Sequence, residues 1–67
     1  MDSSLLKVFV EVARENSITK AANKLNFAQS NVTSRIQQLE KSLGFALFHR
    51  VPKGVILSKE GEKLYPY

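Results

Sequence analysis

Residues 17–44 constrain the fold of this 67-residue chain more than any other stretch. Apolar residues recur there at helical spacing in two runs, one within residues 17–25 and one within residues 28–43. Asn26 and Phe27 stand between the runs. Asparagine tolerates a left-handed backbone, and the phenylalanine ring can close the corner with apolar area. The stretch therefore predicts two helices joined by a tight turn, a helix-turn-helix.

The first run has the features of a helix that a second helix can cross closely. Ser17 is a good N-cap, because its hydroxyl can accept a hydrogen bond from a backbone N–H of the first turn. Lys20 stands where a glutamate would complete a capping box. Ala21 and Ala22 have side chains small enough for close approach of another helix. This run predicts the first helix of the pair.

The second run predicts a helix over about residues 28–42, ended by Gly44. One apolar stripe gives this helix a face to bury, and it consists of Val32, Ile36, Leu39 and Leu43. The other side chains of its first two turns are polar and not acidic: Gln29, Ser30, Asn31, Thr33, Ser34 and Arg35. Glutamine and asparagine can pair with adenine, arginine with guanine, and small hydroxyls with bases or phosphates. These residue types are typical of a recognition helix.

Residues 2–15 predict another helix, which completes the core. Its apolar face consists of Leu5, Val8, Phe9, Val12 and Ala13. Leu6 and Val10 fall outside that face. They leave two interpretations open, a contact with another subunit or a partly exposed pair on a small domain.

Two short segments rich in Val, Phe, Leu and Ile come next, and the Pro-Lys-Gly sequence at positions 52–54 predicts the turn. Segments 45–50 and 51–57 therefore predict a β-hairpin, which directly after a recognition helix is a wing. We expect Arg50 at the base of the hairpin and Lys53 at its tip, where cations can reach phosphates or an adjacent minor groove. Two solvated surface charges are the alternative interpretation.

The last segment, residues 58–67, predicts the start of a helix. Ser58 is placed to cap it, Glu60 favours its first turn, and Pro66 can kink or end it. Its apolar surface is confined to Leu64, Tyr65 and Tyr67. We therefore expect a helix that is truncated in this chain.

The net charge of +4 is concentrated on the predicted helix-turn-helix and wing. Residues 17–53 contain a single acid, Glu40, against the following cations: Lys20, Lys24, Arg35, Lys41, Arg50 and Lys53. Such a concentration raises association with a polyanion and makes binding depend on salt.

Other function classes are disfavoured by the residues that are missing. The chain has no cysteine and one histidine, His49, so we expect no metal site and no cofactor. It has no paired carboxylates, no convergent Ser/His/Asp set and no glycine-rich phosphate loop, which argues against an enzyme. No apolar run approaches the length of a membrane span, and an acid stands at position 2, so we expect a cytoplasmic protein without a membrane partner.

Five ordered motifs carry a resemblance that covers essentially the whole chain: L-L-K-V-F-V-E-V-A, S-I-T-K-A-A-N-K-L, Q-S-N-V-T-S-R-I-Q-Q-L-E-K-S-L-G, L-F-H-R and L-S-K-E-G-E. The chain resembles the N-terminal DNA-binding domain of the LysR-type transcriptional regulators of bacteria. This resemblance implies a mainly α-helical fold with a small β-hairpin. Residues 1–57 would form a three-helix winged helix-turn-helix, and residues 58–67 would begin the linker helix through which such proteins dimerise.

The resemblance also implies an interface with promoter DNA, with the third helix in the major groove and the wing (about residues 46–57) along the adjacent minor groove or backbone. Carried over by position, base or phosphate contacts fall on Gln29, Ser30, Asn31, Thr33 and Ser34, backbone contacts on Ser17 and Thr19, and the wing contact on Lys53. The cations Lys20, Arg35 and Arg50 complete the predicted interface.

Two departures from the family pattern affect this interface. Ala28 replaces the hydroxyl residue common at the start of the recognition helix, which removes an N-cap. Thr33-Ser34-Arg35 stands where many members have Ser-Arg-Gln, so the arginine is displaced by one position around the helix. Which base Arg35 reads is therefore left open.

The implied partner is double-stranded DNA that carries an interrupted inverted repeat. It would be bound by a homodimer joined through the linker helix, and by a higher oligomer of the full-length protein. A small-molecule effector would bind only to a C-terminal domain missing from this chain. The alternative from another class is a small helical protein-interaction module, or anti-regulator, that uses the apolar face around Leu6 and Val10. A third interpretation, binding of structured RNA, differs in the polymer alone.

Overall fold

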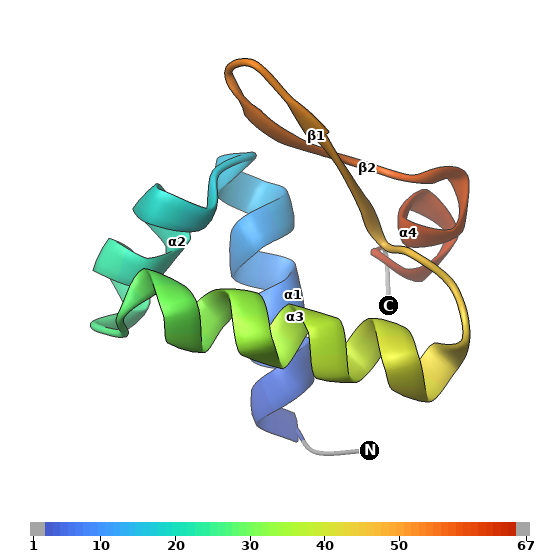
Figure 1. Cartoon of the computed structure of the whole chain (residues 1–67), viewed down its shortest axis with the longest axis horizontal. Coiled ribbons are helices and arrows are strands. Elements are labelled where there is room, and N and C mark those ends of the chain that lie inside the picture. Colours follow the sequence, from blue (N-terminus) through green and yellow to red (C-terminus); the bar gives the residue numbers. More distant parts are fainter. Residues whose placement is uncertain (1–2, 66–67) are drawn as a thin grey trace.

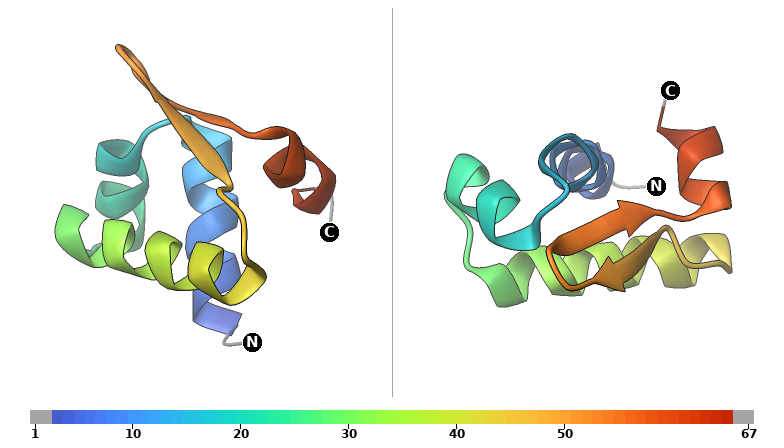
Figure 2. Two further views of the ribbon diagram at one scale, coloured as in Figure 1. Left: turned by 45° about the vertical axis from the view of Figure 1, so that its right-hand side comes forward. Right: turned by 90° about the horizontal axis from the view of Figure 1, so that it is seen from above.

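The computed structural model describes residues 3–65 as four helices and a two-stranded antiparallel sheet. The elements follow in the order α1 (Ser3–Glu15), α2 (Ile18–Leu25), α3 (Gln29–Leu43), β1 (Phe48–Val51), β2 (Gly54–Leu57) and α4 (Lys59–Leu64). Helices α1, α2 and α3 pack against one another, and β2 contacts α1 and α4 (Figure 1). The hairpin passes above α3, and its tip projects over the junction of α1 and α2 (Figures 1 and 2). The predicted winged helix-turn-helix is confirmed.

The core contains the apolar faces that the sequence predicts for the three helices, together with two residues from the wing region. Buried side chains form one cluster: Leu5, Val8, Phe9, Val12, Ala21, Ala22, Val32, Ile36, Leu39, Leu47 and Val55. Ala21 and Ala22 are almost fully buried, as their predicted role in close helix packing requires. The buried side chains of Leu47 and Val55 belong to this cluster, so the wing packs on the same hydrophobic core as the three helices.

The turn of the helix-turn-helix forms at the predicted residues. Ser17 Oγ accepts the backbone N–H of Lys20 at 3.1 Å, which confirms the N-cap of α2. Asn26 adopts a left-handed conformation with φ 63°, and Phe27 is partly buried against the core. Ala28 makes no side-chain hydrogen bond at the start of α3, and Gly44 ends that helix with φ 84°. Helix α3 begins at Gln29, which agrees with the predicted start near residue 28 or 29, and it ends one residue later than predicted, at Leu43.

The hairpin is confirmed, but the position expected for Arg50 was wrong. Val51 closes β1 and Gly54 opens β2, so the turn contains Pro52 and Lys53. Arg50 pairs with Val55, next to the closing pair of the hairpin. Arg50 therefore lies near the tip of the wing and not at its base. Gly54 makes this register possible, because its φ of 145° is a backbone conformation that other residues rarely adopt.

The last helix begins as predicted at Ser58, whose Oγ accepts the N–H of Gly61 at 3.0 Å. Gly61 is buried, and a Cβ atom there would meet the carbonyl oxygen of Leu47. Tyr65 packs edge-on against Phe9, with ring centroids 6.3 Å apart. The proposed kink at Pro66 and the role of Tyr67 lie outside the described residues. Within residues 3–65, no helix combines the length and the apolar character needed to cross a membrane.

Candidate nucleic-acid interface

A polar hollow of about 390 Å³ lies between the helix-turn-helix and the wing. The start of α2, the first turns of α3 and the tip of the hairpin line it with Ser17, Ile18, Thr19, Gln29, Thr33, Arg50, Pro52, Lys53, Gly54 and Val55. Six predicted interface residues thus come together from three separate elements: Ser17, Thr19, Gln29, Thr33, Arg50 and Lys53. The hollow combines amide and hydroxyl groups on its helical side with two cations on its wing side.

The wing is held over this hollow by backbone contacts with the end of α1. The N–H of Val55 donates to the carbonyl oxygen of Asn16 at 3.2 Å. A Cβ atom on Gly54 would meet the same carbonyl, so glycine lets β2 approach this corner closely. Asn16 itself has φ 54°. This contact fixes the distance between Lys53 and the start of α2.

A second attachment joins the wing to the last turn of α3. Glu40 Oε2 accepts the N–H of Leu47 at 2.7 Å and that of Phe48 at 3.4 Å. From the sequence alone, Glu40 stood out only as the one acid of the basic region. The single negative charge in residues 17–53 thus satisfies backbone donors beside the core, where it fixes the wing relative to α3.

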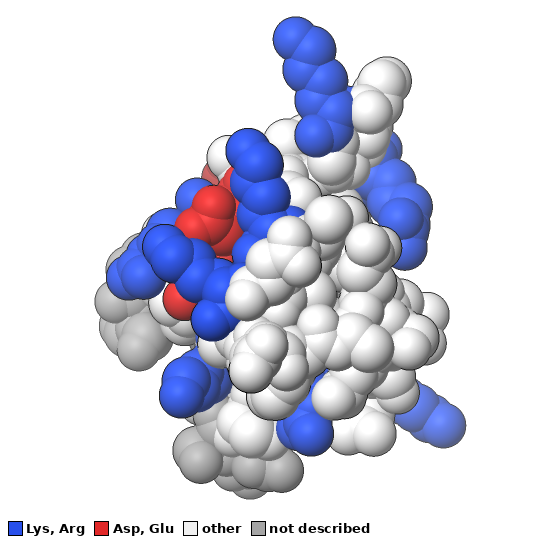
Figure 3. Space-filling model, turned by 90° about the vertical axis from the view of Figure 1, so that its left-hand side faces the viewer, with Lys and Arg blue, Asp and Glu red and all other residues white. Residues whose placement is uncertain are grey.

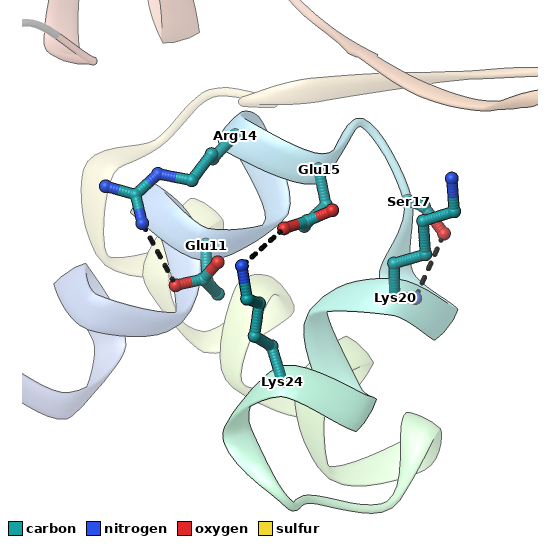
Figure 4. A network of polar contacts seen from close by, with 6 residues as sticks. All are labelled: Glu11, Arg14, Glu15, Ser17, Lys20 and Lys24. Carbon is teal, nitrogen blue, oxygen red and sulfur yellow. Dashed lines mark hydrogen bonds and ion pairs between the residues drawn. The ribbon is translucent and has the colours of Figure 1, made fainter.

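The start of α2 offers hydroxyl groups and one exposed cation to the hollow and its rim. Ser17 uses an oxygen lone pair for the helix cap, and its O–H proton stays free to donate to an external acceptor. Thr19 and Lys20 are exposed. Figure 4 shows Lys24 directed from α2 toward Glu15, with 3.4 Å between Nζ and Oε2, and Arg14 paired with Glu11 at 3.6 Å. The acids of α1 in this view therefore face cations.

The remaining predicted residues of α3 do not line the hollow. Ser30 and Ser34 are exposed, whereas Asn31 and Arg35 are half-buried. Arg35 Nε donates to Asn31 Oδ1, and Arg35 NH1 donates to Ser4 Oγ, both at 2.9 Å. The Arg35 guanidinium also lies over the ring of Phe27, 5.2 Å from its centroid. The structure thus engages Arg35 with three residues of its own chain, Asn31, Ser4 and Phe27.

Basic residues surround an uncharged surface on the side of the molecule that carries α2. Figure 3 shows this uncharged area with Lys and Arg along its margins and with acidic atoms gathered to one side. His49, the lone histidine, is exposed on β1 opposite Ile56. Among residues 3–65, no group of three or more potential ligand side chains is placed to hold a metal ion. The geometry therefore favours recognition of an anionic surface.

Residues 3–62 match the family described as bacterial regulatory helix-turn-helix proteins, lysR family. The chain belongs to the LysR family. Its relatives include two HTH-type transcriptional regulators of Bacillus subtilis (strain 168). YofA is 54% identical over 67 residues, which are 100% of this chain and 24% of YofA. GltR is 52% identical over 67 residues, again 100% of this chain and 23% of GltR. The chain thus spans about a quarter of the length of these relatives.

Solved LysR-type structures share the whole fold. The BenM DNA-binding domain in its complex with catB site 1 DNA superimposes with a TM-score of 0.95 at 42% identity, over 100% of this chain and 75% of that one. The CbnR DNA-binding domain in its DNA complex gives a TM-score of 0.94 at 32% identity, over 98% of this chain and 76% of that one. These similarities establish the LysR-type winged helix-turn-helix fold.

Proposed function

We propose that this LysR-family domain binds double-stranded DNA in a sequence-specific manner. Helix α3 enters the major groove, and the β1–β2 wing lies along the adjacent minor groove or backbone. The observation that carries the proposal is the polar hollow, where Gln29 and Thr33 of α3 face the wing cations Arg50 and Lys53. Amides and hydroxyls read base edges, while cations contact phosphates, so one surface provides both kinds of contact.

The open start of α3 supports this docking. Ala28 provides no side-chain cap, so the N–H groups of the first turn have no side-chain acceptor there. A helix N-terminus of this kind favours an anion, and a DNA phosphate satisfies that requirement. The similar BenM and CbnR domains were solved in complexes with DNA, which agrees with the proposal.

The proposed unit consists of residues 1–57 as the DNA-binding domain and residues 58–67 as the start of a linker helix. Two copies related by a twofold axis place their α3 helices in successive major grooves, roughly 34 Å apart. The operator is then an interrupted inverted repeat, bound by a homodimer in the cytoplasm and by a higher oligomer of a longer protein. Effector sensing belongs to a C-terminal domain outside this chain.

The experiment that tests this function is a titration against a randomised duplex library at two salt concentrations, with selection and sequencing of the bound DNA. We expect recovery of a short motif in inverted repeat and an affinity that falls steeply as salt rises. No enrichment and no salt-dependent binding would contradict the proposal. That outcome would favour the protein-interaction alternative, for which the apolar hollow formed by Leu6, Phe9, Val10 and Leu64 is the surface to test.

A further inference from the structure

A second hollow, of about 130 Å³, continues the polar hollow along α3. Thr33 and Arg50 line both hollows, whereas Gln37 and Glu40 of α3 line the second one only. The space between α3 and the wing therefore extends past Arg35, the last residue of α3 in the predicted interface.

Gln37 stands on the same face of α3 as Gln29 and Thr33. The three residues follow at intervals of four, and side chains four apart are neighbours on a helix. Gln37 is exposed, and within residues 3–65 its side-chain amide has no hydrogen-bond partner. Along the helix axis, Gln37 lies roughly 12 Å beyond Gln29, a distance that corresponds to about three to four base pairs of DNA.

The charges around Gln37 suit a base edge better than a phosphate. Glu40 follows Gln37 by three residues and lines the same hollow, so its carboxylate would repel a phosphate placed there. The polar hollow is the better place for a phosphate, because Arg50 and Lys53 line it and no acid does. A base edge is uncharged, and a glutamine amide offers the donor and the acceptor that match N7 and N6 of adenine.

We propose that Gln37 is a further specificity-determining residue of α3, whose amide reads the adenine of an A·T pair in the major groove. This proposal rests on the proposed function, because it requires α3 to lie in that groove. It extends the reading surface of α3 into a third turn. The pair read by Gln37 is distinct from the pair read by Gln29 and lies about three to four base pairs away from it.

Four variants in the randomised-duplex selection test this proposal: Gln37→Ala, Gln37→Met, Gln38→Ala and the double variant Gln29→Ala/Gln37→Ala. Gln37→Ala should lower the adenine preference at one base pair by roughly 5- to 150-fold, with no change in the salt slope. Gln37→Met should do the same, because methionine keeps the length of the side chain but not the amide. The double variant should relax two separate base pairs. Gln38 is exposed on the same turn but lines neither hollow, so Gln38→Ala should retain every preference.

Several results would overturn this proposal and leave the proposed function intact, since in each of them the wild-type chain still enriches a motif. An unchanged adenine preference in Gln37→Ala would exclude base reading by this residue. Equal weakening of all sequences would place Gln37 on a phosphate. A preference that Gln37→Met retains would show that the amide is not the reading group. A wild-type chain that enriches no motif would remove the proposed function and this proposal together.

A change in the DNA tests the same contact from the other side. Replacement of the assigned adenine by a deaza analogue that lacks N7 removes the acceptor for the Gln37 amide donor. The analogue should weaken binding of the wild-type chain and leave binding of Gln37→Ala unaffected. Equal weakening of both chains would assign that N7 to another side chain and contradict the proposal.

Discussion

The carboxylate of Glu40 accepts the backbone N–H of Leu47 at 2.7 Å, so a side chain of α3 holds the chain segment that leads into the wing. Leu47 is fully buried, and its carbonyl oxygen accepts the N–H of Ser58 at 2.8 Å. The end of α3, the start of the wing and the start of α4 therefore meet at one residue. This junction sets the angle between the two surfaces proposed to contact DNA.

Removal of the Glu40 carboxylate should loosen this junction. Glu40→Ala leaves the N–H groups of Leu47 and Phe48 without their acceptor, and we expect a loss of about 1.5–3 kcal/mol in the free energy of unfolding. Glu40→Gln keeps an accepting oxygen and should lose less. Urea unfolding followed by circular dichroism measures both, with Gln38→Ala, exposed on the same helix, as the control. Equal stability of the Glu40→Ala and Gln38→Ala chains would exclude the attachment.

The features that could be predicted from the sequence are those that depend on near neighbours along the chain. The caps at Ser17 and Ser58 each bond an N–H three residues later, and the left-handed residue Asn26 bonds back within its own helix. Apolar spacing identified the buried faces of the helices for a similar reason. Helical geometry relates residues three and four apart in a fixed way, so their pattern is visible before any tertiary structure is known.

The contacts that could not be predicted join residues whose proximity depends on the packed fold. Arg35 bonds Ser4 across 31 positions, and Val55 bonds Asn16 across the whole helix-turn-helix. Sequence spacing gave no reason to pair them. The same limit explains the position of Arg50, because hairpin register depends on which residue opens the second strand, and Gly54 does so here.

The contact between Gly54 and Asn16 predicts different costs for two glycine substitutions. Gly44 and Gly54 both have positive φ, but a Cβ atom on Gly44 has nothing within 4 Å, whereas one on Gly54 meets the Asn16 carbonyl. We expect Gly44→Ala to cost about 1 kcal/mol from backbone strain alone, and Gly54→Ala to cost about 2–3 kcal/mol. Urea unfolding gives the costs, and amide chemical shifts of Arg50 and Lys53 should move only in Gly54→Ala. Similar costs for both would argue against close docking of the wing.

Ser58 should matter more for stability than Ser17, although both are N-caps. Ser58 is 2% exposed, and its hydroxyl accepts the N–H of Gly61 at 3.0 Å while it donates to the carbonyl oxygen of Ala46 at 2.7 Å. Ser58→Ala breaks both bonds, with an expected loss of about 2–3 kcal/mol, against about 1 kcal/mol for the single cap bond lost in Ser17→Ala. Thermal unfolding of the two variants measures the difference. The reverse order would show that α4 is not anchored through Ser58.

Gln29 and Lys53 face the same hollow from opposite sides, and their substitutions should separate base reading from phosphate contact. Gln29→Ala removes an amide that can bond a base edge, so preference should relax at one base pair, by about 1–3 kcal/mol. Lys53→Ala removes a cation at the wing tip, so all sequences should bind more weakly, and the salt slope should fall by about one. Lys63→Ala is a matched control for charge, because Lys63 is exposed on α4 and does not line the hollow. Selections that leave the base preferences of Gln29→Ala unchanged would show that another face of α3 meets the bases. Ser30 and Ser34 are the exposed side chains of its first two turns that do not line the hollow.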